Sequence, residues 1–125
     1  MDIIITAENT KDYLLVTSKG TLRSQEDLFK EAQLVYEEVL KYDAKKILVN
    51  QLETTLPLSL FNYYNLVNHY ISNFPPDIRS LKAASVIAPQ YEAIANFWET
   101  VCNNRGYLYK AFTSLKDAQH WLIQQ

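Results

Sequence analysis

Residues 45–59, KKILVNQLETTLPLS, decide the fold that we predict for this chain. Ile47, Leu48 and Val49 form a short apolar run after two lysines, a pattern typical of a strand that is covered on both faces. We therefore predict a central parallel strand, followed by a short polar loop and an aromatic-rich helix. In open α/β folds the loops at the carboxyl edge of the sheet hold most functional sites, so we expect the site there.

The length and composition predict one globular domain over residues 1–125. Hydrophobic residues make up 48% of the 125 residues and charged residues 21%, which is close to the average for folded proteins. The 12 Lys and Arg residues stand against 14 Asp and Glu residues, for a net charge of -2. Because no basic cluster is available to neutralise phosphates, we exclude nucleic acid as a partner.

Cysteine content and hydropathy predict a cytoplasmic protein. Cys102 is the one cysteine in the sequence and cannot form an internal disulfide. The first residues, MDIIITAEN, lack the basic region and the long apolar stretch of a secretory leader. The longest apolar runs are also too short to span a membrane, so we expect no membrane span.

The elements before the central strand are a hairpin and a helix. Residues 3–5 and 13–17 are apolar strands joined by a turn that is too short for a parallel crossover, so they should pair antiparallel. Ser24, with Asp27 three residues later, predicts a helix cap. The helix has an apolar stripe of Leu28, Ala32, Val35 and Val39, widened by Phe29, Tyr36 and Leu40. We place Glu31, Glu37, Glu38 and Lys41 on the opposite, polar face.

The rest of the chain alternates helices and strands. Pro57 and Ser59 suit the start of a helix that ends before Pro75, and its predicted buried stripe is Leu60, Tyr64, Val67 and Ile71. A strand over 81–88, a helix that Gly106 closes, a strand over 107–112 and a helix capped by Ser114 follow. This order predicts an α/β domain with a mostly parallel mixed sheet of about five strands, an N-terminal antiparallel hairpin and four helices.

The chain resembles the SpoIIAA-like group of the STAS superfamily. The resemblance rests on the order of elements and on three stretches: ILVN at 47–50, KAASVIAP at 82–89 and YLYKAFTSLKDAQHWL at 107–122. It implies the fold of bacterial anti-sigma factor antagonists, which is related to lipid-binding SEC14-type domains. In the antagonists, a partner kinase phosphorylates a serine or threonine at the start of the helix after the central strand. The matching stretch here offers Thr54, Thr55 and Ser59, although it lacks the Asp-Ser-Ser-Gly type of sequence found there.

Aromatic residues are unusually frequent after the central strand. One buried stripe cannot hold every aromatic side chain of the helix at 60–74, because neighbouring positions point in different directions. We expect an apolar pocket or interface at the carboxyl edge, made of Pro57, Phe61 and Tyr64 with Tyr91 and Trp98 nearby. The alternative is a wide core stripe with scattered exposed tyrosines.

Catalytic and metal-binding patterns are not found in the sequence. His69, His120 and Cys102 have no second ligand at metal-binding spacing and no base that would activate a nucleophile. We therefore expect that the protein binds no metal and no cofactor and that it is not an enzyme. Two hypotheses remain: a regulatory module that docks a protein partner through residues 51–59 and the next helix, and a binder of a small nonpolar molecule. Homodimer formation through exposed tyrosines also stays open.

Overall fold

The computed structural model describes residues 2–57 and 59–124, which form an α/β fold around a mixed sheet of five strands. The strands lie in the order β1 (Asp2–Asn9), β2 (Leu14–Thr21), β3 (Lys46–Thr55), β4 (Lys82–Ile87) and β5 (Leu108–Phe112). β1 and β2 are antiparallel, and all other neighbours are parallel. The predicted hairpin, mixed sheet and central strand are therefore confirmed.

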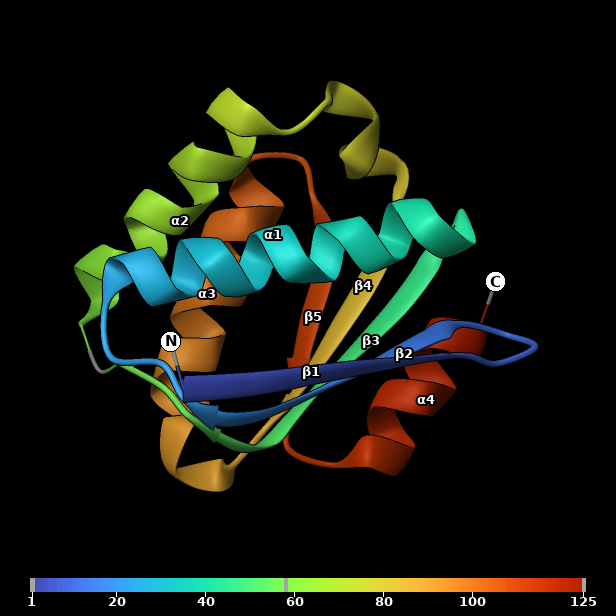
Figure 1. Ribbon diagram of the computed structural model, residues 1–125, viewed down its shortest axis with the longest axis horizontal. Coiled ribbons are helices and arrows are strands. Elements are labelled where there is room, and N and C mark those ends of the chain that lie inside the picture. The colour runs from blue at the N-terminus through green and yellow to red at the C-terminus, as the bar shows by residue number, and fades with distance from the viewer. Residues whose placement is uncertain (1, 58, 125) are drawn as a thin grey trace.

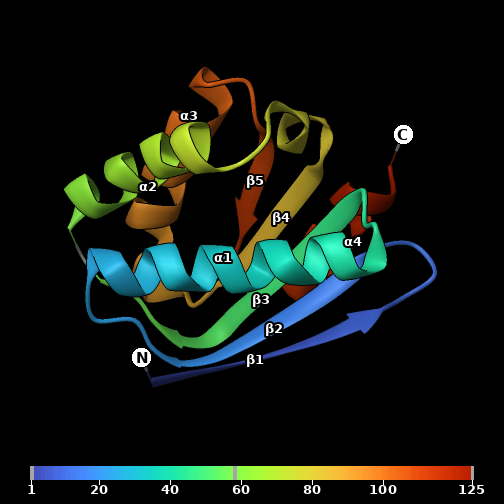
Figure 2. The ribbon, with the colours of Figure 1, turned by 45° about the horizontal axis from the view of Figure 1, so that its top comes forward.

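The helices cover the two faces of the sheet unequally (Figures 1 and 2). They are α1 (Gln25–Tyr42), α2 (Leu60–Asn73), α3 (Glu92–Asn104) and α4 (Leu115–Ile123). From β2 to β5 each crossover moves one strand in the same direction, and right-handed crossovers of this kind place their helices on one common face. α1, α2 and α3 lie on that face, whereas α4 follows the last strand and packs against β3, β4 and β5 from the other side.

Helix ends follow the predicted capping residues at several places. The Ser24 side chain accepts a hydrogen bond from the amide of Asp27 at 3.2 Å, and Ser114 does the same for Asp117 at 3.3 Å. Gly106 follows α3 with a φ of 88°, a left-handed conformation that glycine adopts without strain. A short 3₁₀ helix at Pro76–Ser80 joins α2 to β4.

The predicted polar loop after residue 49 is wrong for its first half, because β3 continues to Thr55. Apart from Leu52, residues 50–55 carry polar side chains, so they give no continuous apolar signal for a strand. They nevertheless pair with β2 through an irregularity: Thr17 is opposite Asn50 and Lys19 is opposite Glu53, which leaves one extra residue on β3. This β-bulge shifts the inward and outward alternation of the following residues. Residue 58 of the predicted loop lies outside the described residues.

The buried face of α2 also differs from the predicted stripe of Leu60, Tyr64, Val67 and Ile71. Only Val67 of these is buried, and the inward face consists of Tyr63, Leu66 and Val67. α2 is apolar around much of its surface, so spacing alone did not determine which side turns inward. α2 packs mainly against α1 and α3 rather than directly on the sheet, which leaves space beneath it. On α1, Leu40 likewise lies outside the buried stripe and is exposed.

Candidate functional site

A cavity of about 180 Å³ lies between the three helices and the sheet. Its walls come from α1, α2 and α3, and its floor comes from β3, β4 and β5. Most of the lining is apolar and includes Leu28, Ala32, Val49, Leu56, Leu66, Ala83, Ile87, Ile94 and Trp98. Leu81 and the half-exposed Leu108 also belong to the lining, so the cavity extends to the surface near the amino ends of β4 and β5.

Glu31 on α1 lines this cavity, although we predicted it on the polar face of the helix. It is only 7% exposed. Glu31 Oε2 accepts a hydrogen bond from the Ser18 hydroxyl, and Oε1 accepts one from Gln51 Nε2, both at 2.8 Å. Burial raises the pKa of Glu31 because it disfavours the charged carboxylate, and the two hydrogen bonds oppose this effect only in part. A buried ionisable group is therefore present in an otherwise apolar cavity.

Five tyrosines line the cavity, and burial shifts the pKa of three of them, Tyr63, Tyr70 and Tyr109. The Tyr63 hydroxyl donates to the backbone oxygen of Pro57 at 3.0 Å, and Tyr70 and Tyr109 line the cavity from α2 and β5. Burial raises the pKa of all three phenols, so they remain neutral at physiological pH. Burial likewise raises the pKa of the Cys102 thiol, which is not a reactive thiolate. These groups can exchange hydrogen bonds with a ligand but are poorly suited to proton transfer at neutral pH.

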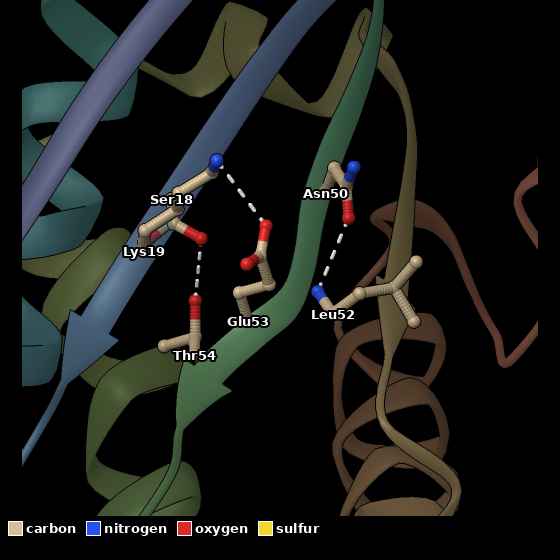
Figure 3. Close-up of polar contacts among 6 residues, drawn as sticks. All are labelled: Ser18, Lys19, Asn50, Leu52, Glu53 and Thr54. Carbon is tan, nitrogen blue, oxygen red and sulfur yellow. Dashed lines mark hydrogen bonds and ion pairs between the residues drawn. The ribbon is translucent and has the colours of Figure 1, made fainter.

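At the end of β3 the neighbouring residues Thr54 and Thr55 have different surroundings, and Figure 3 shows the contacts of Thr54. Thr54 is buried, and its hydroxyl donates to the Ser18 backbone oxygen at 2.7 Å. Thr55, the next residue, is exposed. The bulge is held by a bond from the Leu52 amide to Asn50 Oδ1 at 3.1 Å, and an exposed ion pair joins Lys19 to Glu53 at 3.2 Å. The Thr54 hydroxyl is therefore part of the fold's own hydrogen bonding, whereas Thr55 faces solvent.

The α2 outer face, defined as Leu60, Phe61 and Tyr64, presents apolar side chains to solvent. Their exposed fractions are 46%, 67% and 42%. Positions i, i+1 and i+4 of a helix lie within about 100° of each other, so the three side chains form one patch. Ser59 occupies the N-cap position, but its side chain makes no capping hydrogen bond and is exposed. The guanidinium of Arg105 lies 5.7 Å from the centre of the Tyr64 ring, which places a positive charge at the margin of the patch.

The structure distributes the five predicted pocket residues over different surroundings. Trp98 lines the cavity, and Tyr91 is buried in the same core without lining it. Phe61 and Tyr64 belong to the α2 outer face, and Pro57 is partly buried beside Tyr63.

Glu31 is a site residue that we did not predict from the sequence. It lies three residues after Leu28 and so within the apolar stripe of α1. An acidic residue at that spacing is a usable signal for a buried polar group.

Two further findings concern metals and membranes. Within residues 2–57 and 59–124, no three His, Cys, Asp or Glu residues are grouped in a way that could hold a metal ion. In the same part of the chain, every helix is too short or too polar to span a membrane.

The order of elements, the sheet and the placement of the helices define a SpoIIAA-like fold. A crystal structure of an anti-sigma factor antagonist from Mycobacterium paratuberculosis is similar over 98% of this chain and 95% of its own, with a TM-score of 0.65 and 8% identity. An uncharacterised protein with a SpoIIAA-like fold from Shewanella loihica PV-4 is similar over 97% of this chain and 93% of its own, with a TM-score of 0.57 and 21% identity. No protein-family model matches the sequence, and no curated protein matches it. Likeness at these identities establishes the shared fold.

Proposed function

We propose that this protein is a non-enzymatic regulatory module that docks a protein partner through the α2 outer face. The observation that carries this proposal is the exposure of Leu60, Phe61 and Tyr64 on adjoining turns of one helix. Exposed aromatic side chains grouped in this way are typical of interaction sites, because they bury a large area on binding and lose little side-chain entropy. The fold is shared with a protein that is described as an anti-sigma factor antagonist, and such an antagonist has a regulatory role.

Thr55 and Ser59 are the residues we propose as a switch for this docking. Both are exposed and precede the α2 outer face in the sequence, Ser59 by one residue and Thr55 by five. Phosphorylation would add nearly two negative charges beside an apolar patch, and desolvating those charges would oppose binding. Thr54 is less suited to this role, because its buried hydroxyl donates to the Ser18 backbone.

The test compares two exposed apolar side chains of similar exposure. Phe61→Ser removes the most exposed residue of the α2 outer face, and Leu40→Ser removes a side chain that is 61% exposed on α1. We expect partner proteins cross-linked to the wild type in cell extract to be lost with Phe61→Ser and kept with Leu40→Ser. Thermal unfolding of both variants checks that they are folded. The proposal fails if the two variants recover the same proteins as the wild type.

A second copy of the chain is the alternative occupant of the α2 outer face. Association through Phe61 and Tyr64 would raise the sedimentation coefficient with concentration, and Phe61→Ser would remove that dependence. A sedimentation coefficient that does not change with concentration would count against a homodimer.

We also place the module in the cytoplasm, and we propose that it neither binds nucleic acid nor spans a membrane. The net charge of -2 and the free thiol of Cys102 support this placement.

A second candidate function is binding of a small nonpolar molecule. The observation that favours it is the apolar cavity of about 180 Å³ beneath α2, because natural cores seldom keep unfilled space of this size. Native mass spectrometry of freshly purified protein tests for a molecule that is retained. Protein that shows only its own mass, and that binds no added nonpolar molecule, would contradict this function.

A further inference from the structure

We propose that the cavity binds a small, uncharged apolar molecule of about one ring, whose single hydrogen-bond donor is directed at the Glu31 carboxyl, and that it excludes anions such as fatty acids. This inference rests on the second candidate function and names the chemistry of its ligand. Three properties of the cavity carry it: its size, its charge and the position of its polar group.

The size of the cavity limits the ligand. A cavity of about 150 Å³ in a protein core is known to accept benzene, and the cavity here measures about 180 Å³. A single ring with a short substituent fits this space. A long acyl chain exceeds this volume, so it would have to extend past Leu81 and Leu108 into solvent or move α2 away from α1 and α3.

The charge of the lining opposes anions. No Lys, Arg or His residue is among the described residues that line the cavity, and the lining carboxyl group is Glu31. A ligand carboxylate would therefore lose its hydration without gaining an ion pair, and it would lie near an acidic side chain. Burial of an uncompensated charge is among the most unfavourable events in a protein interior.

The hydrogen bonding of Glu31 leaves room for one more donor. Each of its two oxygens accepts one bond from the protein, from Ser18 and from Gln51. A carboxylate oxygen has two lone pairs, so each can accept a second bond. Because Glu31 is part of the cavity lining, a hydroxyl group on an otherwise apolar ligand can supply that bond.

The test uses three one-ring probes of similar size: phenol, which has a donor, toluene, which has none, and benzoate, which is an anion. Binding to the full chain is measured by NMR titration, in which the amides of α1 and α2 report occupancy of the cavity. We expect phenol and toluene to bind and benzoate not to bind. Each variant described below is first shown to be folded by its amide spectrum.

Substitution of Glu31 separates the polar contact from general apolar binding. Glu31→Leu should lower the ratio of phenol affinity to toluene affinity by about tenfold, as expected for loss of one hydrogen bond to a carboxyl group. The comparison of ratios cancels the different hydration of the two probes. Glu31→Gln keeps a polar group at this position. The logarithm of the ratio of phenol affinity to toluene affinity should therefore fall by less than half of the fall seen in Glu31→Leu.

The outcomes distinguish this inference from the function on which it rests. An unchanged ratio in Glu31→Leu would overturn the polar contact and leave apolar binding in the cavity intact. Benzoate binding as tight as that of phenol would overturn the exclusion of anions. If no probe binds, both the inference and the second candidate function fail. Ala32→Phe, which fills the cavity from α1, should abolish binding of phenol and toluene together.

Discussion

Glu31 shows how a single side chain can bear on both stability and specificity. Its carboxyl is buried among apolar groups, and its two hydrogen bonds to Ser18 and Gln51 join α1 to β2 and β3. Burying the charged form is unfavourable, which raises the pKa of Glu31 relative to the unfolded chain. A residue that served stability alone would more simply be apolar, so a buried carboxyl in a cavity is consistent with a binding role.

Glu31 should make the protein less stable as the pH rises. A carboxyl whose pKa is raised by folding binds more protons in the folded state, so the free energy of unfolding falls between the unfolded pKa near 4.5 and the raised value. The slope for one proton is at most about 1.4 kcal/mol per pH unit. Glu31→Gln should remove this contribution, and urea unfolding from pH 5 to pH 8 measures it. The neighbouring Tyr63 and Tyr70 stay neutral over this range. Parallel pH profiles for the two proteins would contradict the prediction.

At the scale of elements, β3 consists of two different halves. Its first half is an apolar strand between β2 and β4, and its second half is polar and pairs only with β2 after the bulge. Because the bulge adds one residue, Thr54 pairs with Gly20 and lies on the same face as Ser18, while Glu53 pairs with Lys19. The bulge therefore determines which residue near the docking region is buried and which is exposed.

Adjacent threonines should consequently respond differently to the same substitution. Thr54→Val keeps the shape of the side chain but removes the hydrogen bond to the buried Ser18 carbonyl, and we expect it to lower the free energy of unfolding by about 1–2 kcal/mol. Thr55→Val changes an exposed side chain and should stay within about 0.5 kcal/mol of the wild type. Urea unfolding of the two variants provides the comparison. Equal losses would show that the Thr54 hydroxyl does not stabilise the fold.

At the scale of the whole molecule, the features that could be predicted from sequence are those with a local signal. The hairpin, the run 47–49, the caps at Ser24 and Ser114 and the order of elements each depend on neighbouring residues, and the structure confirms them. The inward face of α2 and the burial of Glu31 depend on how helices pack against one another, which local spacing does not specify. The cavity arises from several elements at once, so no single stretch of sequence indicates it.

The unequal covering of the sheet has a measurable consequence for α4. In the part of the chain that the structure describes, α4 is the helix that packs on the face opposite α1, α2 and α3, and there it covers Leu48, Ala84 and Val86. Leu122 points into this layer and is fully buried, whereas the next residue, Ile123, is 48% exposed. Leu122→Ala should therefore lower the free energy of unfolding by about 2–5 kcal/mol, through lost burial and the cavity that remains.

Ile123→Ala is the matched control, because it removes a similar number of carbon atoms from the same turn of α4. We expect a change within about 1 kcal/mol, since much of that side chain is already in contact with water. Against a total stability of about 5–15 kcal/mol, the difference between the two variants should be clear in urea unfolding. Similar stabilities for both variants would mean that α4 is not required to close its face of the sheet, and that the α1, α2 and α3 layer carries most of the fold's stability.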